Sequence, residues 1–312
     1  MAFIYHSENG NTLTKSQEEL LETIENLQFP FGGISKMKDL RTKTKLRVFV
    51  TDREEMLRDW VDYMNQYNAL HDEFYWGKHA PACHRHQGEI GERRNFAQRQ
   101  IRIANEPPEG YQLPLGLYSR TYKWWAGMCR PKVALIMDNV KDYALKTGID
   151  EDIVLGFVFI QEMMHAYFDA FNSKGFPAIE PLEDSFSEFG MLSFINSFSS
   201  LRRLFFPFAL DYVISKIGKK PDGGGFGIEL YNRDDDDALT LINRYRDISN
   251  WTEPPLQYKT DYKRSMEAYE KNPSVENADT VYKYVMGILD LECEPPYDPI
   301  QPAIGEKWDF DR

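Results

Sequence analysis

The stretch VLGFVFIQEMMHAYFDAF, residues 154–171, decides how this chain folds. It predicts a deeply buried helix, because apolar residues surround its few polar positions. Gln161 and His165 lie four residues apart and therefore share one face of that helix. A buried Glu162 and a buried His165 would each need a partner, because an unpaired polar group inside a core costs stability. The simplest interpretation of this spacing is a hydrogen-bonded core histidine beside a paired or solvated glutamate.

A second set of polar groups follows in EDSFSEFG, residues 183–190. Asp184 and Glu188 are also four residues apart, and they come after a turn with proline and glycine at 173–181. A helix that returns after so short a connection would run antiparallel to the first and present its carboxylates to His165. Zinc needs Cys, His or carboxylate ligands, and two antiparallel helices can supply three of them.

Together the two segments resemble the gluzincin type of zinc metallopeptidase. In that family H-E-x-x-H supplies two zinc ligands and a general base, and a glutamate about twenty residues downstream, often within N-E-x-x-S-D, supplies the third. The resemblance covers residues 131–190 well and the rest loosely. It implies an α+β fold with a zincin-like mixed sheet and an active-site helix, followed by a mostly helical C-terminal half. It also implies that the strand expected at 131–137 lies beside that helix and receives an extended peptide.

The resemblance also assigns roles to individual residues. The implied site consists of Glu162 as the catalytic base, of His165, Asp184 and Gln161 as zinc ligands, and of Glu188 and Glu183 as supporting acids or alternative ligands.

Two of the three ligand positions depart from the family. Gln161 stands where the family has its first histidine, and Asp184 stands where it has a glutamate. A carboxamide oxygen is a neutral and weak zinc donor, whereas aspartate is a workable but shorter ligand. At roughly 3 kcal/mol per ligand, losing most of one ligand would weaken zinc binding by about two decades.

Two functions therefore stay open. In the first, the chain is a metallopeptidase with an altered and weakened zinc site, in which Glu162 takes a proton from a zinc-activated water. In the second, it is a catalytically inactive zincin that binds a peptide or a protein partner. An enzyme should lose turnover in a Glu162→Gln variant, whereas a binding module should be indifferent to that substitution and to chelators.

Composition narrows the class of partner. A net charge of −12 argues against general binding to nucleic acids or anionic membranes, although residues 78–102 form one basic stretch that could meet an anionic partner. The longest apolar run, residues 153–160, is too short to span a membrane, and the first residues do not resemble a signal peptide. Three cysteines without C-x-x-C spacing indicate free thiols. We therefore expect a soluble cytoplasmic protein.

A second group of potential metal ligands lies in the loop 78–94, where no pair has a standard zinc-finger spacing, so an ordinary polar loop is the favoured interpretation. Its members are His79, Cys83, His84 and His86.

The remaining patterns predict an α+β chain with a sheet-containing part at 1–175 and a mostly helical part at 176–312, or one continuous domain across both. Predicted strands lie at 45–50, 99–105, 131–137 and within 219–231. Predicted helices lie at 14–27, from Asp52 to about 67, and at 139–147, 181–216, 234–247, 257–271 and 275–292.

Overall fold

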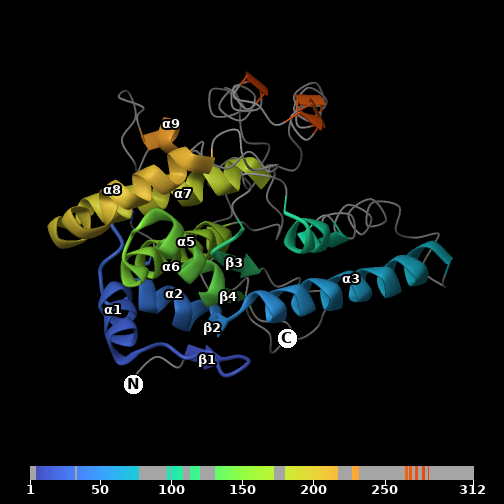
Figure 1. The fold of residues 1–312 in the computed structure, drawn as a ribbon, viewed down its shortest axis with the longest axis horizontal. Coiled ribbons are helices and arrows are strands. Elements are labelled where there is room, and N and C mark those ends of the chain that lie inside the picture. Colours follow the sequence, from blue (N-terminus) through green and yellow to red (C-terminus); the bar gives the residue numbers. More distant parts are fainter. Residues whose placement is uncertain are drawn as a thin grey trace, which may run out of the picture.

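The computed structural model describes residues 5–31, 34–76, 97–98, 100–107, 113–119, 131–171, 180–216 and 227–231, with single positions between 264 and 280. The described part forms a four-stranded sheet with the order β1-β2-β4-β3 (Figure 1). The first three strands in this order are parallel, and β3 is antiparallel to β4. The strands are β1 (Tyr5–Ser7), β2 (Arg47–Thr51), β3 (Gly116–Ser119) and β4 (Lys132–Ile136).

Helices make up most of the described chain, so the architecture is a mixed α/β one that is compatible with the predicted α+β class. The predicted helix at 14–27 and the predicted strands at 45–50 and 131–137 are confirmed within one or two residues at most ends. The helices are α1 (Lys15–Glu25), α2 (Met37–Thr44), α3 (Arg53–Trp76), α5 (Met137–Thr147), α6 (Glu151–Phe171), α7 (Glu180–Ser197), α8 (Ser199–Lys216) and α9 (Gly227–Tyr231).

Two predicted strands are wrong. Residues 100–105 are helical. The two isoleucines that alternate with polar residues there were too few to distinguish the two-residue period of a strand from the 3.6-residue period of a helix. Residues 227–231 form the short helix α9 instead of a strand, and its Leu230 is buried. The predicted helices at 234–247, 257–271 and 275–292 lie outside the described residues, apart from single helical positions.

Helix α6 is the centre of the fold. It contacts β3 and β4 as well as α7 and α8, and α1, α2 and α5 also pack against it (Figure 1). By length and composition a stretch within Glu151–Ala170 could cross a membrane, but 89% of it is buried inside the protein. Such burial is typical of the core helix of a globular fold.

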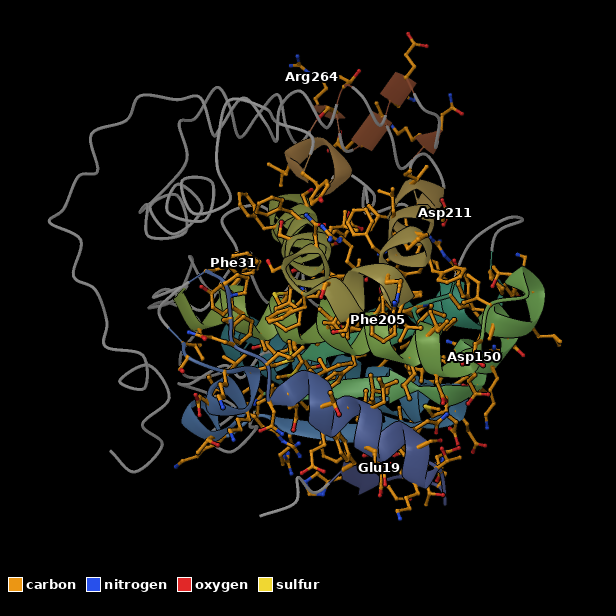
Figure 2. All side chains as sticks on the ribbon, turned by 90° about the vertical axis from the view of Figure 1, so that its left-hand side faces the viewer. Glu19, Phe31, Asp150, Phe205, Asp211 and Arg264 are labelled. Atoms are coloured by element: carbon orange, nitrogen blue, oxygen red, sulfur yellow. The ribbon has the colours of Figure 1, made fainter. Side chains whose placement is uncertain are left out.

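Helix α8 packs closely on α6 through an aromatic side chain and a glycine. A Cβ atom at Gly156 of α6 would lie 2.8 Å from the ring of Phe205 in α8, so only glycine leaves room for that ring. Figure 2 shows Phe205 inside the packed layers, whereas Glu19 and Asp211 lie on the outside. The second half of the described chain is therefore anchored directly on the motif helix.

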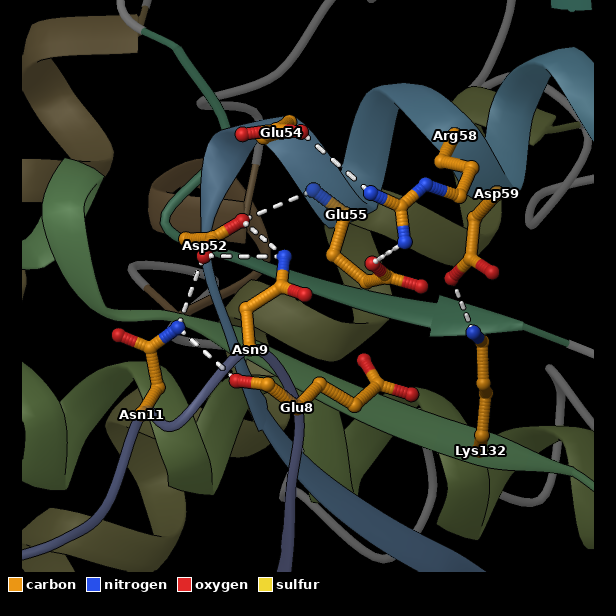
Figure 3. A network of polar contacts seen from close by, with 9 residues as sticks. All are labelled: Glu8, Asn9, Asn11, Asp52, Glu54, Glu55, Arg58, Asp59 and Lys132. Carbon is orange, nitrogen blue, oxygen red and sulfur yellow. Dashed lines mark hydrogen bonds and ion pairs between the residues drawn. The ribbon is translucent and has the colours of Figure 1, made fainter.

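The ends of β1 and β2 are joined by a polar network (Figure 3). Asp52 accepts a hydrogen bond of 2.8 Å from the backbone N–H of Glu55, and in this way Asp52 caps α3 as predicted. Asp52 also accepts a hydrogen bond of 2.9 Å from Asn11 Nδ2. Burial alone would raise the pKa of Asp52, but hydrogen bonds from Glu55, Asn11 and Asn9 hold that pKa below its usual value. Helix α3 continues to Trp76 and is longer than predicted.

Candidate functional site

Strand β3 lies alongside the motif helix α6. A Cβ atom at Gly116 would lie 2.7 Å from Glu162 Cγ, so glycine permits this close approach. Tyr118 is two residues further and on the same face of the strand. Its ring lies nearly parallel to that of His165, with the centroids 6.3 Å apart, and its hydroxyl donates a 2.8 Å hydrogen bond to Asp169 Oδ2. Glu162, His165 and Asp169 are spaced as one line along α6, and β3 follows that line.

Helix α7 approaches His165 from another side. His165 Nε2 lies 3.7 Å from Asp184 Oδ1, and the two side chains are 12% and 28% exposed. This separation is longer than a hydrogen bond. The two side chains form an ion pair when the His165 imidazole is protonated. The structure thus brings together the histidine and the downstream aspartate of the predicted site.

Gln161 contacts a different set of groups. The Nζ atom of Lys216, at the end of α8, lies 3.3 Å from Gln161 Oε1 and 3.1 Å from Glu188 Oε1. The same ammonium lies 4.1 Å from the centroid of the Tyr212 ring, within the range of a cation–π contact. The Lys216 side chain is only 1% exposed, so its terminal nitrogen lies inside the helical layer.

Glu188 joins three helices through its two oxygens. While Oε1 pairs with Lys216, Oε2 accepts a 3.0 Å hydrogen bond from the backbone N–H of Gly227, the first residue of α9. A Cβ atom at Gly227 would lie 2.3 Å from Glu188 Cβ and 2.7 Å from the backbone nitrogen of Phe189. Real Cβ atoms do not approach so closely, so this contact between α9 and α7 requires glycine.

The side chains as arranged do not fit the zinc site that the sequence implied. The Gln161 oxygen, the atom of that side chain that could bind zinc, accepts a hydrogen bond from the Lys216 ammonium. Within the residues that the structure describes, no group of three or more His, Cys, Asp or Glu side chains could hold a metal ion. Two unit charges of like sign 4 Å apart repel by about 4 kcal/mol at an effective dielectric constant of 20, and a dication doubles that repulsion. The Lys216 ammonium would therefore repel a zinc ion bound to the Gln161 oxygen.

Other predicted site residues have different outcomes. Glu183 lies in α7, but its side chain is not among those described. The cluster formed by His79, Cys83, His84 and His86 lies outside the described residues, as does most of the basic stretch 78–102.

The strand predicted at 131–137 lies beside α6 as expected, but its position in the sheet does not suit the peptide that it was expected to receive. Strand β4 is paired on both of its edges, by β2 and by β3, so it offers no free edge for a further strand. The outer strand next to α6 is β3, which the sequence analysis did not predict.

Sequence reasoning also missed Lys216 and Gly227. A lysine at the end of a helix is usually a solvated residue near the negative end of the helix dipole, and nothing local distinguishes this one. The run DGGGFG at 222–227 indicated a turn, but its spacing could not reveal the contact with Glu188. Comparisons of the chain with models of known protein families, with curated proteins and with solved structures find no match.

Proposed function

We propose that this chain is a zincin-like protein that binds an extended peptide segment of a partner and does not hydrolyse it through zinc. The observation that carries the proposal is the position of β3, an outer antiparallel strand that follows the line Glu162, His165 and Asp169 of α6. Peptide recognition at the edge of a sheet uses such a strand, because its outward backbone groups can pair with an extended chain.

The hydrogen-bonding pattern identifies those outward groups. Leu115 accepts a 3.0 Å hydrogen bond from the backbone N–H of Ile136, so Leu115 and Leu117 direct their backbone groups toward β4. The backbone groups of Gly116 and Tyr118 therefore point the other way. Within the described part of the chain, only β4 pairs with β3. These two residues lie on the outer edge of β3, where a peptide strand would be added.

The charges beside β3 favour a peptide with a basic side chain. Glu162 lies beside Gly116 of β3, and Asp184 lies 3.7 Å from His165, so both contribute carboxylates near this strand. A lysine or arginine side chain of the peptide could meet these carboxylates, since charged groups at an interface are arranged to complement each other. The net charge of −12 agrees with a basic peptide and with the proposed soluble, cytoplasmic setting.

A direct test measures the retention of tryptic casein peptides, which end in lysine or arginine, on the immobilised full chain by mass spectrometry. Tyr118→Pro removes an outward N–H and should abolish retention. Tyr118→Phe keeps that N–H and should retain the peptides. Ser7→Pro is the matched control at the opposite edge, because Glu8 bonds to β2 and Ser7 faces outward. Equal retention by Tyr118→Pro and the wild type, or no retention by either, would sink the proposal.

The hydrolytic alternative has one observation in its favour. His165 and Asp184 do approach each other, and Glu162 is close by on the same helix. The discriminating assay follows quenched fluorogenic peptides in the presence of zinc. Turnover by the wild type that disappears in Glu162→Gln would replace the binding proposal with a peptidase.

A further inference from the structure

We infer that the Lys216 ammonium is a resident internal cation that balances Glu188 and keeps a metal ion away from Gln161. The inference rests on the proposed zincin-like nature of the site, but not on whether β3 binds a peptide. The cation of this site belongs to a side chain of the protein itself.

The geometry around Nζ is that of a constructed cation site. Three groups from three helices surround the ammonium: Glu188 Oε1 of α7 at 3.1 Å, Gln161 Oε1 of α6 at 3.3 Å and the ring of Tyr212 of α8 at 4.1 Å. They supply a carboxylate, an amide dipole and an aromatic face, all of which favour a positive charge. The Lys216 side chain, which these three groups surround, is 1% exposed.

Glutamine at position 161 suits an ammonium better than histidine would. The amide oxygen accepts a hydrogen bond from the ammonium and needs no change of protonation state. A metal-binding imidazole directs a lone pair at its metal and usually donates its other N–H to a carboxylate or carbonyl. Beside a lysine ammonium, that lone pair would accept a hydrogen bond from the ammonium and would not be available to a metal. Gln161 and Lys216 are therefore two parts of one arrangement.

Glu188 pairs with this cation in a buried setting. Its second oxygen already accepts the Gly227 backbone N–H, so its local environment is built for a carboxylate. Removing only the ammonium would leave a buried acid without this counter-ion, which is much more costly than replacing both charges. The lysine consequently has a structural effect that a double-mutant cycle can measure.

The experiment compares zinc content after incubation with zinc and desalting, in the full-length wild type and in three variants. These are Gln161→His, Lys216→Met and the two substitutions combined. The wild type and both single variants should retain almost no zinc. The combined variant should retain about one zinc per chain, because the introduced imidazole would join His165 and Asp184 once the ammonium is gone. Stoichiometric zinc in Gln161→His would overturn the exclusion, as would a folded combined variant without zinc.

A second measurement tests the charge-balancing role through stability, and if Lys216→Met does not fold, the readout is whether folding returns in the double variant with Glu188→Gln. Glu188→Gln removes the charge that the lysine balances, so adding it should recover most of the stability lost in Lys216→Met. Urea unfolding of the two single variants and the double variant gives the coupling between the residues. Independent, additive losses would overturn the charge-balancing role. Neither experiment involves a peptide, so a failure here is distinguishable from a failure at the β3 edge.

Discussion

Lys216 Nζ lies 3.1 Å from Glu188 Oε1, and each side chain is 1% exposed, so this ion pair is sealed from solvent. A buried pair of this kind adds little net stability compared with two well-packed apolar residues, because both charges lose their hydration. Removing only one of the two charged side chains is costly, because the charge of the other stays buried. The pair therefore makes the contact between α7 and α8 specific, and it makes single substitutions there informative.

Replacing Lys216 by methionine should lower the free energy of unfolding by roughly 3–5 kcal/mol, because Glu188 would keep a buried charge without its lysine partner. Urea denaturation followed by circular dichroism measures this change. Lys141→Met is the matched control, since Lys141 is exposed on α5, and it should change stability by less than about 0.5 kcal/mol. Equal effects of the two substitutions would contradict a buried ion pair.

Alanine at Gly227 should destabilise the contact between α9 and α7 by roughly 1–3 kcal/mol, because the new Cβ would overlap Glu188 Cβ and nearby backbone. The thermal midpoint should fall accordingly. Gly148→Asn serves as the comparison, because Gly148 has a positive φ of 72° and a Cβ added there would meet no atom within 4 Å. Asparagine tolerates that backbone conformation, so its cost should be small. An unchanged midpoint for Gly227→Ala would rule out the tight contact.

A pH dependence should arise from Glu25 of α1, which pairs with Arg41 Nη1 at 2.9 Å in the core. Burial raises the pKa of Glu25 from 4.5 to about 7, although Arg41 acts to lower it. The folded protein therefore binds this proton more tightly than the unfolded chain does. The contribution of Glu25 to stability is full below pH 4.5 and decreases as the pH rises through 7, by at most about 3 kcal/mol.

The measurement is the difference in unfolding free energy between the wild type and Glu25→Gln at several pH values from about 4.5 to 8, the window set by the two pKa values. As the pH rises, the unfolding free energy of the wild type should fall relative to that of Glu25→Gln. Glu22→Gln changes an exposed carboxylate of the same helix and should follow the wild-type profile. Parallel curves for the wild type and Glu25→Gln would show that the Glu25 carboxyl is not perturbed.

Chelation should leave the wild type unaffected. Because the Lys216 ammonium supplies the positive charge beside Glu188, we expect folding not to depend on a metal ion at this position. Thermal unfolding with EDTA and with added zinc should give the same midpoint. A midpoint that falls with EDTA and recovers with zinc would show that the folded protein binds the metal, in conflict with this expectation.

The sequence predicted those parts of the fold that local patterns encode. The apolar residues around Gln161 indicated a buried helix, and the alternation in KLRVFV indicated a strand; both are present as α6 and β2. Strand β3 was missed because its four residues, Gly116–Ser119, carry no clear alternation and begin with glycine. Its place beside α6 follows from tertiary pairing, which no local pattern contains.

For the candidate site, the sequence identified the residues better than their partners. The spacing of His165 and Asp184 suggested that they would meet, and their side chains are 3.7 Å apart in the structure. The partner of Gln161 could not be predicted in the same way. Lys216 lies far along the chain, and its burial depends on how α8 crosses α6 and α7. Long-range packing of this kind leaves no periodic trace in the sequence.

The contacts of Lys216 have a dynamic consequence. Its side chain is held in the interior by Gln161 of α6 and Glu188 of α7, so local opening of the turn of α8 that carries Lys216 would pull on both residues. Amide hydrogens in that turn should consequently exchange with deuterium as slowly as those at the centre of α8, and they should open together with α6.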